Sequence, residues 1–348
     1  APILSPFPSR GTGAAGRGRV PGMRATGREI GVFALLTVIW GTTWAAIRVS
    51  LEGIPPVTGV AIRFALAGVV LVAIGRLRGV RFGRLPGEAR LWWINAATTF
   101  AGSYGIVYWG EQWVPSGLAA VLFATLPLWI VILGHFMLPG ERGGGRRLTG
   151  VLFGFAGVAI IFSEDFAKLG GPQVFFAAMV FLLAPFVSAL GSLSVKRWGG
   201  GISPYSIAGV PMLMTGGAMG VLALLVERAR PIAPMVGEGA AAAPWLATLY
   251  LALFGSALTF SLYFWLLARR SAVAASLISY TVPICAVLVG WLAFAEPVTW
   301  RLVAGGGVVL LGVAATLWTG QGPGRGIGPG AGLEPRSAPQ RDKDAASR

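Results

Sequence analysis

The 348-residue chain is 55% hydrophobic and only 12% charged, and its mean hydropathy is +0.72. A soluble globular domain has about 25% charged residues, so this composition excludes an ordinary water-soluble protein and indicates a membrane protein. The formal net charge of +15 does not indicate a nucleic-acid-binding protein, because the basic residues form short clusters between long apolar runs. The single cysteine, Cys285, excludes a disulfide framework and a cysteine-based metal site.

The two ends of the chain differ in composition from its middle. Residues 1–30 are rich in Pro, Gly, Ser and Arg and have no periodicity that could bury a core, which predicts a disordered basic arm. The apolar run after this arm has two tryptophans and no small-residue cleavage site, so we interpret it as an uncleaved first span rather than a signal peptide. Residues 320–348 are of low complexity and are expected to form a disordered tail.

Ten apolar runs are long enough to cross a bilayer core of about 30 Å as helices of about 20 residues. The runs are continuous rather than alternating, which favours helices over strands. We therefore predict an all-α polytopic membrane protein with ten transmembrane helices. Their approximate bounds are 31–50, 57–75, 91–112, 116–138, 147–163, 172–195, 204–226, 244–267, 272–294 and 301–319.

The loops between these spans predict the orientation, because cytoplasmic loops carry an excess of Lys and Arg. One set of loops holds most of these residues, namely Arg76, Arg78, Arg81, Arg84, Arg90, Arg142, Arg146, Arg147, Lys196, Arg197, Arg269 and Arg270. The opposite set holds Arg48, Lys168, Arg228, Arg230 and Arg301. We therefore expect a multi-pass protein of the cell membrane with both termini in the cytoplasm.

An internal repeat divides the chain into residues 31–163 and 172–319. Shifting the sequence by 156 residues lays the segment that begins at Ser116 over the one that begins at Ala272, and Pro127 then matches Pro283. Glu141 matches Glu296 when one gap is allowed. Each copy holds five spans, an odd number, so the second copy must be inverted in the membrane. Inverted repeats are typical of secondary transporters, which open a midplane site to one side and then to the other.

Several motifs in this order resemble the EamA-type ten-helix exporters of the drug/metabolite transporter superfamily. The motifs are Trp40-Gly41-Thr42-Thr43-Trp44, Pro56 followed by Arg63-Phe64, the segment from Glu111 to Ala120, Glu141 followed by Gly150 and Gly157, and Glu296 followed by Gly305 and Gly312. The resemblance covers about residues 31 to 319. It implies a cell-membrane exporter of small metabolites, with a central cavity lined by helices 1, 3, 4, 6, 8 and 9.

Glu111 is the carboxylate closest to the interior of an apolar span. It shares a helix face with Tyr108 and Tyr104 and precedes Gln112, and we place all four residues in the substrate pathway. The face could bind a cationic or zwitterionic substrate or take up a proton, because intramembrane ionisable groups are functional by default. The alternative is a solvated carboxylate at the membrane edge. Leu267 occupies the position equivalent to Glu111, so the carboxylate is an asymmetric addition.

Pro127 and Pro283 lie in the middle of their spans at equivalent positions of the two copies. Each proline removes a helical hydrogen bond and leaves the carbonyl of Phe123 or Ser279 without its usual donor. We interpret the two prolines as hinges or cavity-lining breaks. A static kink satisfied by neighbouring side chains or water is the alternative.

Aromatic residues in three spans complete the predicted pathway. Trp40 and Trp44 lie one turn apart on the first span with Thr43 beside them, a spacing that can form a cavity wall. Tyr263 and Trp265 on the eighth span and Tyr280 on the ninth offer hydrogen bonds and stacking. Packing or lipid contact is the alternative for such aromatics.

Other polar residues are interpreted as structural. Arg63 is expected near the outer end of its helix, where it could pair with Glu52 or with lipid phosphates. Asn95 is expected to bond a neighbouring helix. His135, the only histidine, has no companion ligands, so we expect neither a metal nor a cofactor. The Gly150-x3-Gly154 and Gly216-x3-Gly220 spacings allow close helix approach, which leaves a homodimer as an open alternative.

The predicted function is therefore secondary transport. No G-x4-G-K-[ST] phosphate-binding loop occurs in the sequence, which disfavours an ATP-driven pump. The main alternative is a membrane-embedded enzyme acting on a lipid or small amphiphile, but the apolar spans lack a nucleophile with a base, paired acids or a metal cluster. We expect alternating access around a midplane cavity, with export of small metabolites or drug-like compounds (efflux).

Overall fold

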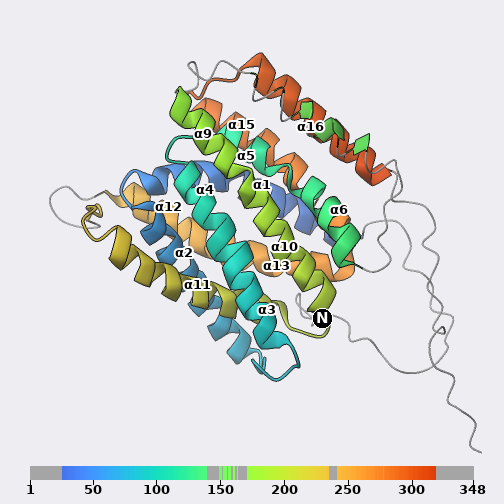
Figure 1. Cartoon of the computed structure of the whole chain (residues 1–348). Coiled ribbons are helices and arrows are strands. Elements are labelled where there is room, and N and C mark those ends of the chain that lie inside the picture. Colours follow the sequence, from blue (N-terminus) through green and yellow to red (C-terminus); the bar gives the residue numbers. More distant parts are fainter. Residues whose placement is uncertain are drawn as a thin grey trace, which may run out of the picture.

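The computed structural model describes residues 26–138, 149–150, 152–154, 156–157, 160, 163, 171–234, 241–276 and 278–318. Within these residues the chain forms helices and no strands, and the helices pack as a bundle (Figure 1). We define the inner end of the bundle as the end where α1 begins, at Gly27, and the outer end as the one where α1 finishes, at Leu51.

The first half contains two uninterrupted helices and two segmented ones. The uninterrupted helices are α1 (Gly27–Leu51) and α2 (Pro56–Leu77). The segmented ones are α3 (Glu88–Asn95), η1 (Ala96–Ser103) and α4 (Tyr104–Gly110), followed by α5 (Ser116–Phe123) and α6 (Leu126–Met137). Eight of the seventeen residues of the fifth predicted span, 147–163, lie outside the described residues.

The second half also contains uninterrupted and segmented helices. Its helices are α9 (Pro172–Phe181), α10 (Leu183–Trp198), α11 (Pro204–Val226), α12 (Ala242–Ala252), η2 (Leu253–Leu258), α13 (Thr259–Arg269), α14 (Ala272–Ser276), α15 (Ile278–Phe294) and α16 (Trp300–Trp318). Prolines begin helices in both halves, at Pro56, Pro172 and Pro204. The N–H that proline lacks is not needed for an intrahelical bond at these positions.

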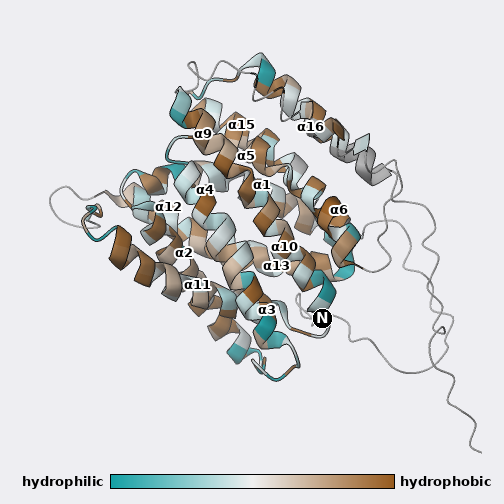
Figure 2. Ribbon diagram, in the orientation of Figure 1, coloured by the Kyte–Doolittle hydropathy of each residue, from teal (hydrophilic) through white to brown (hydrophobic). Residues whose placement is uncertain are grey.

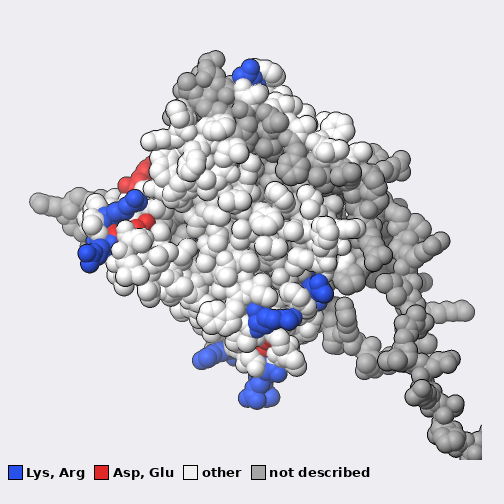
Figure 3. All heavy atoms as spheres, in the orientation of Figure 1, with Lys and Arg blue, Asp and Glu red and all other residues white. Residues whose placement is uncertain are grey.

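The surface confirms the prediction of an all-α membrane protein. Six helices in the described part of the chain are long and apolar enough to cross a membrane. Polar residues concentrate near helix ends (Figure 2), and charged atoms gather at the edges of the face in Figure 3, with a wide uncharged area between them. Large apolar side chains are exposed on this scaffold, as at Leu77 (88%), Leu224 (72%) and Trp93 (71%), where lipid rather than water is the suitable solvent.

Glycines bring α2 and α11 into close contact. A Cβ atom at Gly68 would lie 2.6 Å from the backbone nitrogen of Leu213, and one at Gly216 would lie 2.5 Å from that of Ala65. Gly216 therefore packs within the chain, while a Cβ at Gly220 would meet no atom within 4 Å.

Carboxylates from one half stabilise helix beginnings in the other. Glu227, at the end of α11, accepts hydrogen bonds from the backbone N–H groups of Val57 (3.0 Å) and Thr58 (2.8 Å) at the beginning of α2. Glu88, at the beginning of α3, accepts a hydrogen bond of 2.5 Å from the hydroxyl of Ser206 near the beginning of α11. A negative charge at a helix N-terminus is favourable because the unsatisfied N–H groups point toward it.

Two π-helical segments interrupt the third and eighth predicted spans. The segment η1 covers Ala96–Ser103 and η2 covers Leu253–Leu258. The 156-residue shift places the first of these over residues 252–259, so the two interruptions coincide in the repeat alignment. Such segments are rare and occur frequently at functional sites.

Candidate functional site

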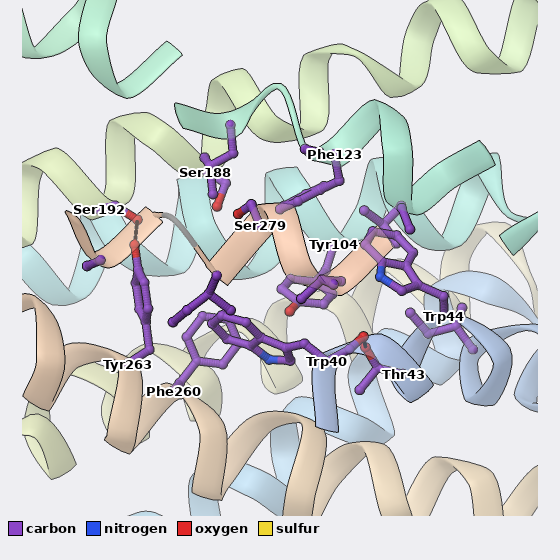
Figure 4. Close-up of a pocket in the computed structure, with 18 residues that line it drawn as sticks. Trp40, Thr43, Trp44, Tyr104, Phe123, Ser188, Ser192, Phe260, Tyr263 and Ser279 are labelled. Atoms are coloured by element: carbon purple, nitrogen blue, oxygen red, sulfur yellow. Dashed lines mark hydrogen bonds between the residues drawn. The ribbon is translucent and has the colours of Figure 1, made fainter. Parts of the chain in front are cut away.

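A cavity of about 70 Å³ lies in the centre of the bundle (Figure 4). We call it the central cavity. Its walls come from the first, third, fourth, sixth, eighth and ninth predicted spans, which are the spans that the resemblance implies. The lining residues are Trp40, Thr43, Trp44, Ile47, Tyr104, Val107, Ala120, Phe123, Ala124, Leu126, Ser188, Ser192, Phe260, Tyr263, Ala275, Ile278, Ser279 and Val282.

Aromatic rings form much of this wall and hold one another in place. Trp40 packs against Phe260 and Tyr263 with ring centroids 5.6 and 5.5 Å apart. Trp44 packs against Phe123 at 5.6 Å. These distances and tilted geometries are the ones that aromatic pairs prefer. The wall is therefore apolar and well packed, which suits a ligand with an apolar or planar part.

A few polar groups interrupt the apolar wall. The hydroxyl of Tyr263 donates a hydrogen bond of 3.3 Å to the hydroxyl of Ser192, and Ser188 and Ser279 also line the cavity. The indole N–H groups of Trp40 and Trp44 are buried and have no hydrogen-bond partner in the described part of the chain. Buried donors without a partner are costly, so both indoles could donate to an acceptor on a bound molecule.

A second space, of about 620 Å³, opens at the outer end, and we call it the outer vestibule. It is lined by Arg48, Leu51, Glu52, Glu111, Gln112, Trp113, Val114, Pro115, Phe294, Ala295, Glu296 and Pro297. The helices α1 and α15 contribute to both spaces, with Ile47 in the central cavity and Arg48 in the vestibule. The two spaces thus share α1 and α15 as walls.

An ion pair lies at the inner end of the bundle. Arg270 donates hydrogen bonds of 3.0 and 2.5 Å to the two carboxylate oxygens of Glu29, at the beginning of α1. The ammonium group of Lys196 donates to the carbonyls of Leu267 and Arg270, which attaches α10 to the end of α13. The bundle therefore has a vestibule at its outer end and an ion pair at its inner end.

The predicted pathway residues fall into several places. Trp40, Thr43, Trp44, Tyr104 and Tyr263 line the central cavity, while Glu111 and Gln112 line the outer vestibule. Tyr108 is fully buried and lines neither space. Trp265 also lies outside both linings; the guanidinium groups of Arg269 and Arg28 lie 4.2 and 5.2 Å from its ring centroid. The side chain of Tyr280 lies outside the described residues.

The two prolines occupy different local structures. Pro127 lies in the first turn of α6, directly after the break at Ala124 and Thr125 that separates α5 from α6. Pro283 lies inside α15, which continues through it. The positions are equivalent in the repeat alignment, but only the fourth predicted span is broken beside its proline.

Two predictions about polar residues can be compared with the structure. Asn95 donates a hydrogen bond of 3.1 Å to the carbonyl of Ile207 on α11, as expected of a helix-packing residue. The prediction for Arg63 was wrong, because its side chain is fully buried rather than exposed at an interface. Its Nε donates to the hydroxyl of Ser256 at 2.8 Å and its Nη2 to the carbonyl of Gly255 at 3.1 Å. Both acceptors belong to η2, whose irregular backbone could not be recognised in the sequence.

An all-α bundle with lipid-type surfaces and an internal cavity between two half-molecules is the architecture of a membrane carrier. Residues 28–163 and 175–318 each match the EamA-like transporter family, and the chain belongs to this family. It is therefore a multi-pass membrane protein of a transporter family.

Known proteins similar to this chain are also named as transporters. The uncharacterized inner membrane transporter YedA of Escherichia coli is 31% identical over 75% of this chain and 81% of YedA. The uncharacterized transporter YoaV of Bacillus subtilis is 25% identical over 82% of this chain and 94% of YoaV. A solved crystal structure with 21% sequence identity has a TM-score of 0.64 and covers 85% of this chain and 98% of the other, which supports the fold.

Proposed function

We propose that this protein is a secondary transporter that exports small metabolites or drug-like compounds across the cell membrane by alternating access. The observation that carries the proposal is the central cavity, which is lined by both halves of the chain and shares α1 and α15 with the outer vestibule. Both termini lie in the cytoplasm in this proposal, as the distribution of Lys and Arg predicts. The inner membrane location in the name of YedA is consistent with it.

The size of the central cavity indicates an occluded state. Ligand pockets usually measure about 300–1,000 Å³, whereas this cavity measures about 70 Å³. A cargo molecule therefore requires movement of the aromatic wall or of the helices that carry it. In this mechanism the two halves move against each other, and Pro127 provides a hinge between α5 and α6.

The chemistry of the path limits the cargo. The cavity presents aromatic faces, hydroxyl groups and two indole N–H donors, and the vestibule presents Glu111. We propose that Glu111 attracts a cationic or zwitterionic cargo or exchanges a proton. Energy comes from an ion gradient or from the gradient of the cargo itself.

A metabolite comparison tests export and identifies the cargo. Culture medium from cells that overproduce the protein is compared with medium from cells that lack it, and a compound enriched in the first and depleted in the second is the candidate cargo. The Trp44→Ala variant, which alters the cavity wall, should abolish or change the enrichment. The Trp93→Ala variant is the matched control, because Trp93 is 71% exposed.

Counterflow into vesicles then separates transport from catalysis. Purified protein is reconstituted, the vesicles are loaded with unlabelled cargo, and entry of labelled cargo is followed. Accumulation of chemically unchanged label supports the carrier. A converted product would contradict the proposal and would favour a membrane-embedded enzyme.

A further inference from the structure

Three buried residues near the outer end have polar atoms without hydrogen-bond partners. These atoms are Nη1 of Arg63, the hydroxyl of Tyr108 and both carboxylate oxygens of Glu111, within the part of the chain that the structure describes. Arg63 and Tyr108 are fully buried, and Glu111 is 6% exposed. Burying such groups unpaired is costly, most of all for charged groups.

The three side chains come from two helices, α2 and α4. Tyr108 and Glu111 are one turn apart at the end of α4, and the guanidinium carbon of Arg63 on α2 lies 5.9 Å from the ring centroid of Tyr108. It lies closer, at 4.6 Å, to the ring of Tyr104, which lines the central cavity. Tyr108 therefore lies beside Arg63 in space and one turn from Glu111 along its own helix.

Arg63 and Glu111 nevertheless form no direct ion pair. The ion pairs among the described residues join Arg48 to Glu296 and Arg270 to Glu29. Unsatisfied buried polar atoms in native proteins are usually bridged by ordered water, which donates and accepts several hydrogen bonds. A metal cation is less suitable than water here, because the guanidinium already balances the carboxylate.

The repeat alignment indicates that this arrangement is more than packing. The alignment of Pro56 with Pro204 places Pro211 opposite Arg63, and Leu267 is opposite Glu111. Both charges are thus present in the first half and absent at the equivalent positions of the second half. The second half folds without these charges. The two charged residues are therefore not required by the scaffold and have a role that is specific to the first half.

We propose that Arg63, Tyr108 and Glu111 hold water between them as a hydrated charge pair, and that this site takes up and releases the coupling proton of the transporter. The proposal rests on the proposed transport function. A hydronium ion that enters from the outer vestibule transfers its proton to a carboxylate oxygen of Glu111 and leaves water. The net charge of the site then changes from neutral to positive, because Arg63 keeps its charge while Glu111 loses its own. Arg48 from α1 and Glu296 beyond α15 line the outer vestibule together with Glu111.

A double-mutant cycle on purified protein in detergent tests the charge pair without any cargo. Arg63→Gln and Glu111→Gln should each lower the midpoint temperature of unfolding, because each leaves one buried charge unbalanced. The double variant should recover more than half of the summed loss. Glu227→Gln combined with Arg63→Gln is the matched control and should be additive, since Glu227 bonds the beginning of α2 instead. Additive losses in the Arg63–Glu111 cycle would overturn the proposal.

Proton binding is measured on the same samples with a pH-indicator dye. On acidification from about pH 8 to about pH 5, the wild-type protein should bind more protons than Glu111→Gln, which lacks the carboxylate. Equal proton binding by the two proteins would overturn the coupling role. Neither measurement requires transport, so a failed metabolite comparison and a failed charge pair are distinguishable.

Discussion

Arg48 and Glu296 form an ion pair that joins the outer end of α1 to the segment that follows α15. The carboxylate of Glu296 also accepts hydrogen bonds of 3.0 Å from the backbone N–H groups of Ser116 and Gly117, at the beginning of α5. Gly290 provides the room, because a Cβ atom there would collide with Glu296. One carboxylate therefore connects three elements that surround the outer vestibule.

The Glu296→Gln variant should weaken this connection. The amide keeps the shape of the side chain but loses the charge that favours Arg48 and the helix N-terminus, so we expect about 1–3 kcal/mol of destabilisation. Thermal unfolding in detergent measures the loss. Glu52→Gln, which removes an exposed carboxylate of the same vestibule, should change stability little. An equal loss in the two variants would contradict the assignment.

Exchanging the charges of Glu29 and Arg270 should test whether their ion pair closes the inner end of the bundle. Glu29→Arg or Arg270→Glu alone places like charges together and should open the inner end, whereas the double exchange should restore closure. The readout is labelling of Ser279→Cys, a cavity position, by an impermeant thiol reagent in a Cys285→Ala background. Labelling of inside-out vesicles should rise several-fold in the single variants and return toward the parent level in the double variant. Unchanged labelling in the single variants would show that this pair is not a gate.

The close contact between α2 and α11 predicts opposite effects at adjacent glycines. Gly216→Ala adds a Cβ atom 2.5 Å from the backbone of Ala65, so we expect about 1–3 kcal/mol of destabilisation. A Cβ atom at Gly217 meets nothing within 4 Å, and Gly217→Ala should be neutral or stabilising by about 0.5–1 kcal/mol. Thermal unfolding of the two variants provides the comparison. A Gly216→Ala protein as stable as Gly217→Ala would contradict the packing.

The Pro127→Ala variant should slow transport without unfolding the protein. Alanine allows α5 and α6 to join into one helix across the break at Ala124 and Thr125, which would stiffen the hinge. Counterflow rates should fall several-fold while the unfolding temperature stays equal or rises. Pro172→Ala is a suitable control, because Pro172 begins a helix rather than following a break inside a span. An unchanged transport rate would exclude the hinge.

The sequence was sufficient for most of the fold because membrane helices obey a strong local rule. Every backbone polar group in lipid must be bonded within its helix, so long apolar runs predict spans directly. The predicted start of α2 differs by one residue from the observed start at Pro56. The predicted start of α11 coincides with the observed start at Pro204. The π-helical segments could not be predicted, since a change from one hydrogen-bond register to another leaves composition and hydropathy unchanged.

The site was only partly predictable for a related reason. Spacing on a helix identifies residues that share a face, and Trp40, Thr43 and Trp44, which were grouped in this way, all line the central cavity. Spacing does not reveal which neighbouring helix that face meets. Arg63 was therefore placed at an interface, although η2 supplies buried acceptors that allow it to remain inside. An arginine within an apolar run was the available signal.

The π-helical segments η1 and η2 have a consequence for rotational phase. A π-type turn accommodates one extra residue, and one residue in an α-helix corresponds to roughly 100° of rotation. The side chains after η1, including Tyr104 and Glu111, and those after η2, including Tyr263, therefore have angular positions that depend on the π-type turn before them. If the same residues formed regular α-helix instead, composition, hydropathy and charge would be unchanged, but these side chains would rotate away from the helices that they now face. Deleting one residue from either segment should have the opposite outcome, because a regular α-helix would then keep the side chains on both sides of the segment in phase.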